Sequence, residues 1–227
     1  MERTWYHTAK ECIALRKHVL RADMCIFIDD ETAFANVNYL NSTIKSILTA
    51  SIINGLDIIG ILSSKSPAVG WKAVKMASDQ KMDLVVIPGQ TYICRDNEEI
   101  YVYKLRKPLP PTMSLDKACE YAHKQGGFVI ASNVGKRQAQ LLDKLQGSDF
   151  APDGIEIFNG KVGGFRDLNI DYPSFISSGA TSATDLEDSK IFTLIDRHKA
   201  VDMKLIGEEQ GVDYVPNYLQ PKAPGRV

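Results

Sequence analysis

The stretch EYAHKQGGFVIAS, which runs from Glu120 to Ser132, contains the pattern that decides the fold class. Its first half completes an amphipathic helix predicted over residues 114–125, and the Gly126-Gly127 pair ends that helix. The apolar run at 128–131 then has the length and composition of a buried strand. A helix followed at once by a buried strand is the repeating unit of an α/β protein.

The same alternation continues on both sides of this unit. Further strands are predicted at residues 25–28, 57–62, 84–87, 99–105, 154–158, 174–177 and 191–194. Further helices are predicted at residues 3–20, 42–54, 69–80, 136–145 and 184–188. Pro88-Gly89 is predicted to close its strand, and Asn41 and Ser42 are predicted to cap a helix. Strands alternating with helices over the whole length predict a parallel sheet, open or closed into a barrel.

The bulk properties set limits on size, partners and compartment. The 227 residues suit a single domain over 1–227, with an N-terminal helix at 1–21 and a C-terminal helix and tail at 199–227. With 27 basic and 28 acidic residues, the net charge of -1 does not favour nucleic acid. Four cysteines without a C-x-x-C pair, and no signal peptide, predict reduced thiols in the cytoplasm. No apolar run approaches the roughly 20 residues of a membrane span.

Four segments in this order resemble the PHP superfamily, named for polymerase and histidinol phosphatase. They are LDIIGI at 56–61, VIPG at 86–89, EYAHKQGGFVIAS at 120–132 and DGIEIFNG at 153–160, of which the last is the closest match. The resemblance covers about residues 22–193 and implies a distorted, TIM-like (β/α) barrel of mostly parallel strands. It also implies phosphoester hydrolysis, which active members perform with two or three divalent metals held by His, Asp and Glu.

The ligand positions that the resemblance implies hold other residues here. The opening Asp-x-His-x-His corresponds to residues 23–27, so that Asp23 is kept while Cys25 and Phe27 stand in place of the histidines. The next Asp-His falls on Ser63-Ser64, and the Glu after Pro-Gly falls on Thr91.

The remaining positions have changed in the same way. One histidine falls at or near Tyr101, and the histidine of an Ala-His-Pro step has become Ser132. The closing Gly-Ser-Asp-Ala-His corresponds to residues 179–183, with Thr181 and Ala183 in place of Asp and His. Hydroxyls, a phenyl ring and one thiol do not assemble a site for divalent metals, so we expect no metal cofactor and no metal-dependent catalysis.

The substitutions leave a pocket rim rich in hydroxyl groups. In one interpretation, these groups form hydrogen bonds to a small-molecule ligand. Small polar residues that merely fill an emptied site are the simpler interpretation. Lys65, Lys136 and Arg137 lie near this rim and could contact phosphate.

Three functions remain open at this point. The leading hypothesis is a catalytically inactive barrel that acts as a binding, scaffold or regulatory protein, whose protein or small-molecule partner is unknown. The second is a hydrolase with a rebuilt site, for example with Cys25 as nucleophile, although a thiol in an apolar strand is more often inert. The third is RNA binding, because the plan resembles the metal-free PHP-like subunit of ribonuclease P, although the charge does not indicate it.

The sequence also predicts the roles of the histidines and the conformation of one turn. The four histidines, His7, His18, His123 and His198, are expected on or beside helices in structural or solvated roles. Asn159-Gly160 is expected to form a tight turn in which Gly160 adopts a positive φ.

Overall fold

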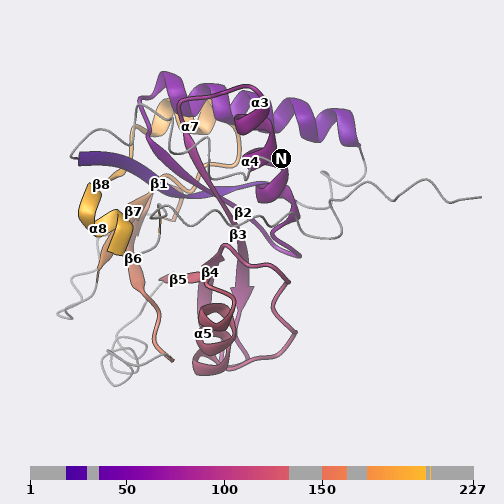
Figure 1. The fold of residues 1–227 in the computed structure, drawn as a ribbon, viewed down its shortest axis with the longest axis vertical. Helices are drawn as coiled ribbons and strands as arrows, with labels where there is room; N and C mark the ends of the chain where they lie inside the picture. Colours follow the sequence, from indigo (N-terminus) through magenta and orange to yellow (C-terminus); the bar gives the residue numbers. More distant parts are fainter. Residues whose placement is uncertain (1–18, 30–35, 133–149, 163–172, 203–204, 206–227) are drawn as a thin grey trace, which may run out of the picture.

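The computed structural model describes residues 19–29, 36–132, 150–162, 173–202 and 205 (Figure 1). Its strands are β1 (Val19–Phe27), β2 (Ile58–Ser63), β3 (Val85–Ile93), β4 (Glu99–Tyr103), β5 (Phe128–Ser132), β6 (Gly154–Asn159), β7 (Ser174–Ser177) and β8 (Thr193–Asp196). Its helices are α3 (Val37–Ile53), α4 (Ala68–Asp79), α5 (Leu115–Lys124), α7 (Ala183–Ser189) and α8 (Arg197–Asp202). The helices predicted at 3–20 and 136–145 lie almost entirely outside the described residues.

The eight strands form one sheet in the order β7-β6-β5-β4-β3-β2-β1-β8. Within this sheet β1, β2, β3, β5, β6 and β7 all run in one direction, because β4 pairs antiparallel with both β3 and β5. The last strand, β8, pairs antiparallel with β1. The carboxyl ends of six parallel strands therefore meet at one edge, which is where α/β barrels place their functional residues.

The sheet curves until its two ends nearly meet. At the carboxyl end of β1, Ile26 bridges Ala180, and the Phe27 N–H donates to the Ala180 carbonyl at 2.8 Å. At the other end β8 lies beside β1, and its Thr193 hydroxyl bonds both the N–H and the carbonyl of Ile176 in β7, each at 2.8 Å. A side chain thus links β7 to β8, and the strands form a nearly closed barrel.

Helices cover the outside of this barrel. The helices α3 and α7 pack against each other next to β1, α4 packs on β2 and β3, and α5 packs on β5 (Figure 1). The inner faces of α3 and α4 bury Ile44, Ile47, Val69 and Ala73 with the outward side chains of β1 and β2. None of the helices in the described segments has the length and apolar character that crossing a bilayer requires.

Three aromatic rings fill the inside of the barrel. Tyr103 and Phe128 have ring centroids 6.3 Å apart, and Phe128 meets Phe175 edge-on at 6.0 Å. Room for the Tyr103 ring comes from two glycines, since a Cβ on Gly60 or Gly89 would lie 2.8 or 2.7 Å from that ring. The Tyr103 hydroxyl donates to the Met24 carbonyl, which fixes the ring across the barrel.

The structure corrects two predictions near the N-terminus. The predicted helix cannot extend to Leu20, because β1 begins at Val19, where exposed Val19 and Arg21 alternate with buried Leu20 and Ala22 in the strand period. The next helix begins at Val37 instead of 42, because the Asn36 side chain accepts from the backbone N–H groups of the first turn. Asn41 and Ser42 therefore lie inside α3 and do not cap it.

Pro88-Gly89 does not end its strand as predicted. Both residues lie inside β3 and pair with Ile61 and Leu62 of β2. Pro88 has no N–H to donate, but its carbonyl accepts from the Lys104 N–H at 2.7 Å and the residue stays in register with Ile61. The predicted strand at 191–194 is displaced to β8, 193–196. The other predicted strands and helices in the described segments agree with the structure to within a few residues.

We predict that Gly89→Asn destabilises the fold by about 1–3 kcal/mol, because the new side chain must displace Leu62 or Tyr103. Urea unfolding of the purified proteins measures the loss. Gly126→Asn is the control, since Gly126 has φ +74° with nothing within 4 Å of a Cβ, and Asn tolerates this conformation. Equal losses in the free energy of unfolding for the two variants would contradict the claim that Gly89 is needed to make room for the Tyr103 ring.

Candidate functional site

Polar side chains gather inside the barrel at the carboxyl edge of the parallel strands. We call this group the edge cluster; its members are Asp23, Cys25, Tyr101, Ser132, Glu156, Asn159 and Ser178. All seven are buried, although five of them carry polar groups that normally face water. They come from β1, β4, β5 and β6 and from the residue after β7, so the cluster depends on the closed sheet.

Irregularities in two strands bring these side chains inward. The pairing of β6 with β7 shifts register between Glu156 and Phe158, so both Glu156 and Asn159 reach the same cluster. The pairing of β1 with β2 shifts between Asp23 and Ile26. Such bulges re-aim side chains next to functional sites in many sheets.

Glu156 is the centre of the edge cluster. Its Oε2 accepts from the Tyr101 hydroxyl at 3.1 Å and lies 3.0 Å from the Ser132 Oγ, while its Oε1 accepts from the Asn159 amide at 3.1 Å. The Ser132 and Tyr101 hydroxyls are also 2.7 Å apart. Burial raises the pKa of Glu156, and the hydrogen bonds from Ser132, Ser177, Asn159 and Tyr101 offset part of that rise.

Asp23 lies beside this network and is fully buried. Its Oδ1 accepts from the backbone N–H groups of Cys25 and Ser178, at 3.2 and 3.1 Å. Its Oδ2 has no hydrogen-bond partner in the described part of the chain. Burial, helped by the charge of Glu156, raises the pKa of Asp23 to about 7 in spite of the Ser178 hydrogen bonds. A protonated Asp23 is the form that this environment favours below neutral pH.

Cys25 is a buried thiol, not an exposed nucleophile. Its Sγ lies 3.7 Å from the Asn159 amide nitrogen. Burial and the neighbouring Glu156 raise the pKa of Cys25 well above its ordinary value, so the reactive thiolate is disfavoured. Cys94 and Cys119 are also buried and unpaired.

Asn159 joins the cluster to the loop that follows β6. Its Oδ1 accepts from the N–H groups of Lys161 and Val162, at 3.1 and 3.4 Å. Gly179, with φ +67°, passes so close that a Cβ would lie 2.2 Å from this oxygen. Gly160 does not have the predicted positive φ; a side chain there would instead lie 2.6 Å from the Ser178 carbonyl, so close packing and not turn geometry requires this glycine.

The structure brings together four of the ten positions implied by the resemblance, namely Asp23, Cys25, Tyr101 and Ser132. Phe27 is half-buried and packs against the barrel interior. Ser63 is buried but donates to the Ser66 carbonyl, while Ser64 and Lys65 are exposed and Thr91 is half-buried. Thr181 is exposed and Ala183 begins α7. Lys136 and Arg137 lie outside the described residues, and whether any of these positions binds a ligand stays a prediction.

Outside the cluster, one described ion pair lies at this edge, while His123 and His198 lie near the amino ends of the parallel strands. Lys161 Nζ lies 2.9 Å from Asp185 Oδ2 and 2.7 Å from the Thr181 hydroxyl, which ties the β6 loop to α7. His123 Nε2 lies 3.0 Å from Asp153 Oδ2, which also accepts from the Val129 N–H. His198 is exposed on α8.

Sequence reasoning missed Glu156, Asn159 and Ser178 as members of the cluster. A signal for Glu156 was present, because DGIEIFNG places one acidic residue between apolar neighbours in a predicted buried strand. An ionisable side chain in such a strand must be paired or have a shifted pKa. The inward turn of Asn159 depends on the bulge in β6, which leaves no recognisable mark in the sequence.

The donors of the edge cluster do not fit a two- or three-metal centre. A hard divalent ion needs several free anionic oxygens, but both Glu156 oxygens and one Asp23 oxygen already accept hydrogen bonds. Burial also favours the protonated forms of Asp23, Glu156 and Cys25. Among the described residues, no three His, Cys, Asp or Glu side chains are grouped as metal ligands.

Comparison with known proteins identifies the fold. The sequence matches no protein-family profile and no curated protein. The structure is similar to that of a candidate metal-dependent phosphoesterase from Bifidobacterium adolescentis, with a TM-score of 0.58 and 13% sequence identity. The match covers 83% of this chain and 96% of the other. The predicted fold class, an α/β barrel of mostly parallel strands, is therefore confirmed.

We predict that Asp23→Asn removes a pH dependence of stability. In the folded chain the pKa of Asp23 is about 7, against 3.8 normally, so the folded state keeps a proton that the unfolded state has released. The free energy of unfolding therefore falls as pH rises through this window, by roughly 2–3 kcal/mol between about pH 5 and about pH 8. Urea unfolding at the two pH values measures the change.

The same measurement on Asp96→Asn provides the control, because Asp96 is an exposed aspartate outside the cluster. Glu156 titrates in the same direction, so Asp23→Asn should flatten the profile without removing all of its slope. Identical pH profiles for wild type and Asp23→Asn would contradict a protonated, buried Asp23.

Proposed function

We propose that this PHP-type barrel is not a metal-dependent phosphoesterase and acts by binding a protein or small-molecule partner. The observation that supports this most directly is the hydrogen bonding of both Glu156 oxygens inside the barrel: Oε2 accepts from Tyr101 and lies 3.0 Å from the Ser132 hydroxyl, and Oε1 accepts from Asn159. These contacts occupy the edge where the fold places chemistry. The carboxyl group serves the packing of the barrel.

Converting this cluster to a metal site would be energetically costly. A metal must displace the donors of Glu156 and take a proton from Asp23, whose pKa is raised to about 7. Each buried donor that loses its acceptor costs about 1–3 kcal/mol. Two carboxylates and one protonated thiol supply too few ligands to repay that loss, since tight divalent binding needs about four or more well-placed donors.

A thiol-dependent hydrolase is the rival that this chemistry disfavours. A cysteine nucleophile needs a lowered pKa and access to substrate. Cys25 has a raised pKa and is only 6% exposed. No described lysine or arginine contacts its sulfur to stabilise a thiolate.

The accessible part of the predicted rim lies over β2 and β3. Ser64 and Lys65 follow β2 and are exposed, and Thr91 lies next to them, since Ser63 pairs with Gln90. Their hydroxyl and ammonium groups suit hydrogen bonding to a partner that approaches the carboxyl edge. We place the binding surface of the proposed function here.

We predict that manganese does not raise the melting temperature of the wild-type protein. A ligand at 100 times its Kd would add about 2.7 kcal/mol, which for a chain of this size is roughly 5–10 °C. A thermal melt with and without manganese detects such a shift easily. Hydrolysis of bis(p-nitrophenyl) phosphate, with and without a chelator, tests turnover in the same samples.

Two variants test whether one added histidine is enough to create a manganese site. Ser132→His adds one ligand and should gain neither manganese binding nor activity. Phe27→His should lower stability without metal, by up to about 3 kcal/mol, because the ring packs on the barrel interior. A manganese-dependent rise in wild-type melting temperature, or turnover that a chelator abolishes, would overturn the proposed function.

A further inference from the structure

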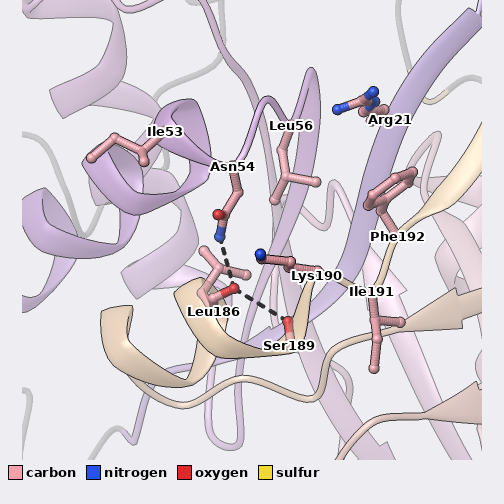
Figure 2. A pocket seen from close by; sticks show the side chains of 9 residues that line it. All are labelled: Arg21, Ile53, Asn54, Leu56, Leu186, Ser189, Lys190, Ile191 and Phe192. Carbon is pink, nitrogen blue, oxygen red and sulfur yellow. Dashed lines mark hydrogen bonds between the residues drawn. The ribbon is translucent and has the colours of Figure 1, made fainter.

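A hollow lies away from the edge cluster, between the carboxyl ends of α3 and α7 and the start of β8. Its volume is about 380 Å³, within the range of small-molecule sites. Figure 2 shows its walls, to which the C-cap of α3 contributes Asn54, α7 contributes Leu186, and β1 contributes Arg21. The hollow is on the outside of the barrel and shares no residue with the cluster around Glu156.

Two cations line this hollow. The Arg21 guanidinium lies 5.1 Å from the centre of the Phe192 ring, in a cation–π contact that holds it at the wall. Gly55 makes room for it, since a Cβ there would lie 3.2 Å from an Arg21 nitrogen. Lys190 follows α7 in the left-handed conformation, and its side chain extends across the hollow towards Asn54 (Figure 2). Neither cation has an ion-pair partner in the described part of the chain.

The polar surroundings of these cations favour an anion. No acidic side chain from the described residues lines the hollow. The end of α7 carries the negative pole of a helix, but its Leu186 carbonyl already accepts from the Asn54 amide at 2.7 Å and from the Ser189 hydroxyl at 3.3 Å. The last carbonyls of α3, those of Ala50, Ser51 and Ile52, likewise accept from the N–H groups of Asn54, Leu56 and Gly55. Protein donors therefore partly offset the negative poles of both helices, and among the described residues that line the hollow the only charged side chains are those of Arg21 and Lys190.

The rest of the wall is apolar. Of the lining residues, Leu56 and Leu186 are buried, and Ile191 and Phe192 are half-buried. A planar guanidinium and an ammonium suit the oxygens of a phosphate group, while the aliphatic and aromatic walls suit an apolar body.

From this arrangement we infer that the hollow binds a small organic phosphate, with the phosphate between Arg21 and Lys190 and the apolar part against Leu56 and Phe192. This site does not depend on the proposed function, because it lies on another face and uses other residues. Phenyl phosphate has both required parts and serves as the probe. Benzyl alcohol has only the ring, and inorganic phosphate has only the charge.

Calorimetric titration of the full chain at low salt tests the inference. Phenyl phosphate should bind saturably and at least about tenfold more tightly than either benzyl alcohol or inorganic phosphate, and added salt should weaken it. Arg21→Gln and Lys190→Gly should each weaken binding about tenfold or more, because each removes a charge-assisted contact.

Lys81→Gly is the matched control. Lys81 is an exposed lysine after α4 with φ 51°, and Lys190 has φ 46°, so glycine relieves the same backbone conformation at both positions. Both glycine variants should melt at or above the wild-type temperature, but only Lys190→Gly should lose binding. Absence of saturable binding by wild type, equal binding of benzyl alcohol, or unchanged affinity in both Arg21→Gln and Lys190→Gly would overturn the inference.

Discussion

The whole barrel depends on the contact between the Tyr103 ring and the bare backbone of Gly60 and Gly89. A ring of this size fits across a narrow barrel only where neighbouring strands carry no side chain. From that position the Tyr103 hydroxyl reaches the Met24 carbonyl, beside Asp23. The aromatic core and the edge cluster are thus adjacent layers, and the first fixes the backbone on which the second is built.

The edge cluster contains two buried carboxyl groups, those of Asp23 and Glu156. A metal centre would neutralise their charge by coordination, whereas here protons and hydrogen-bond donors do so. One Asp23 oxygen accepts hydrogen bonds from backbone N–H groups, and both Glu156 oxygens accept hydrogen bonds from side chains. The residues around the carboxyl groups, and not the fold itself, therefore decide how their charge is offset.

Sequence patterns predicted the described elements well where a strand or helix had its own local signal. The glycine pair before Phe128 and the alternation in β4 are such signals. Prediction was wrong where tertiary contacts overrode local propensity: Pro88 and Gly89 remain in β3 because neighbouring strands accept them, and β1 extends back to Val19 because β8 pairs with it. Asp23, Cys25, Tyr101 and Ser132 could be placed through the family resemblance, but the bulge that turns Asn159 inward could not be predicted.

The order of the strands has a consequence for how the chain folds. From β1 to β7 each strand pairs with the next one in sequence, so most of the sheet can grow by adding neighbours at small cost in loop-closure entropy. Among the strand pairings of the described residues, those of β1 with Ala180 and with β8 join distant parts of the chain. Such non-local contacts slow folding, which makes closure of the barrel the natural late step. Until then β1 is an unpaired edge, open to association with another chain. The Thr193 hydroxyl, which bonds β7 across the seam, would then be among the last contacts to form.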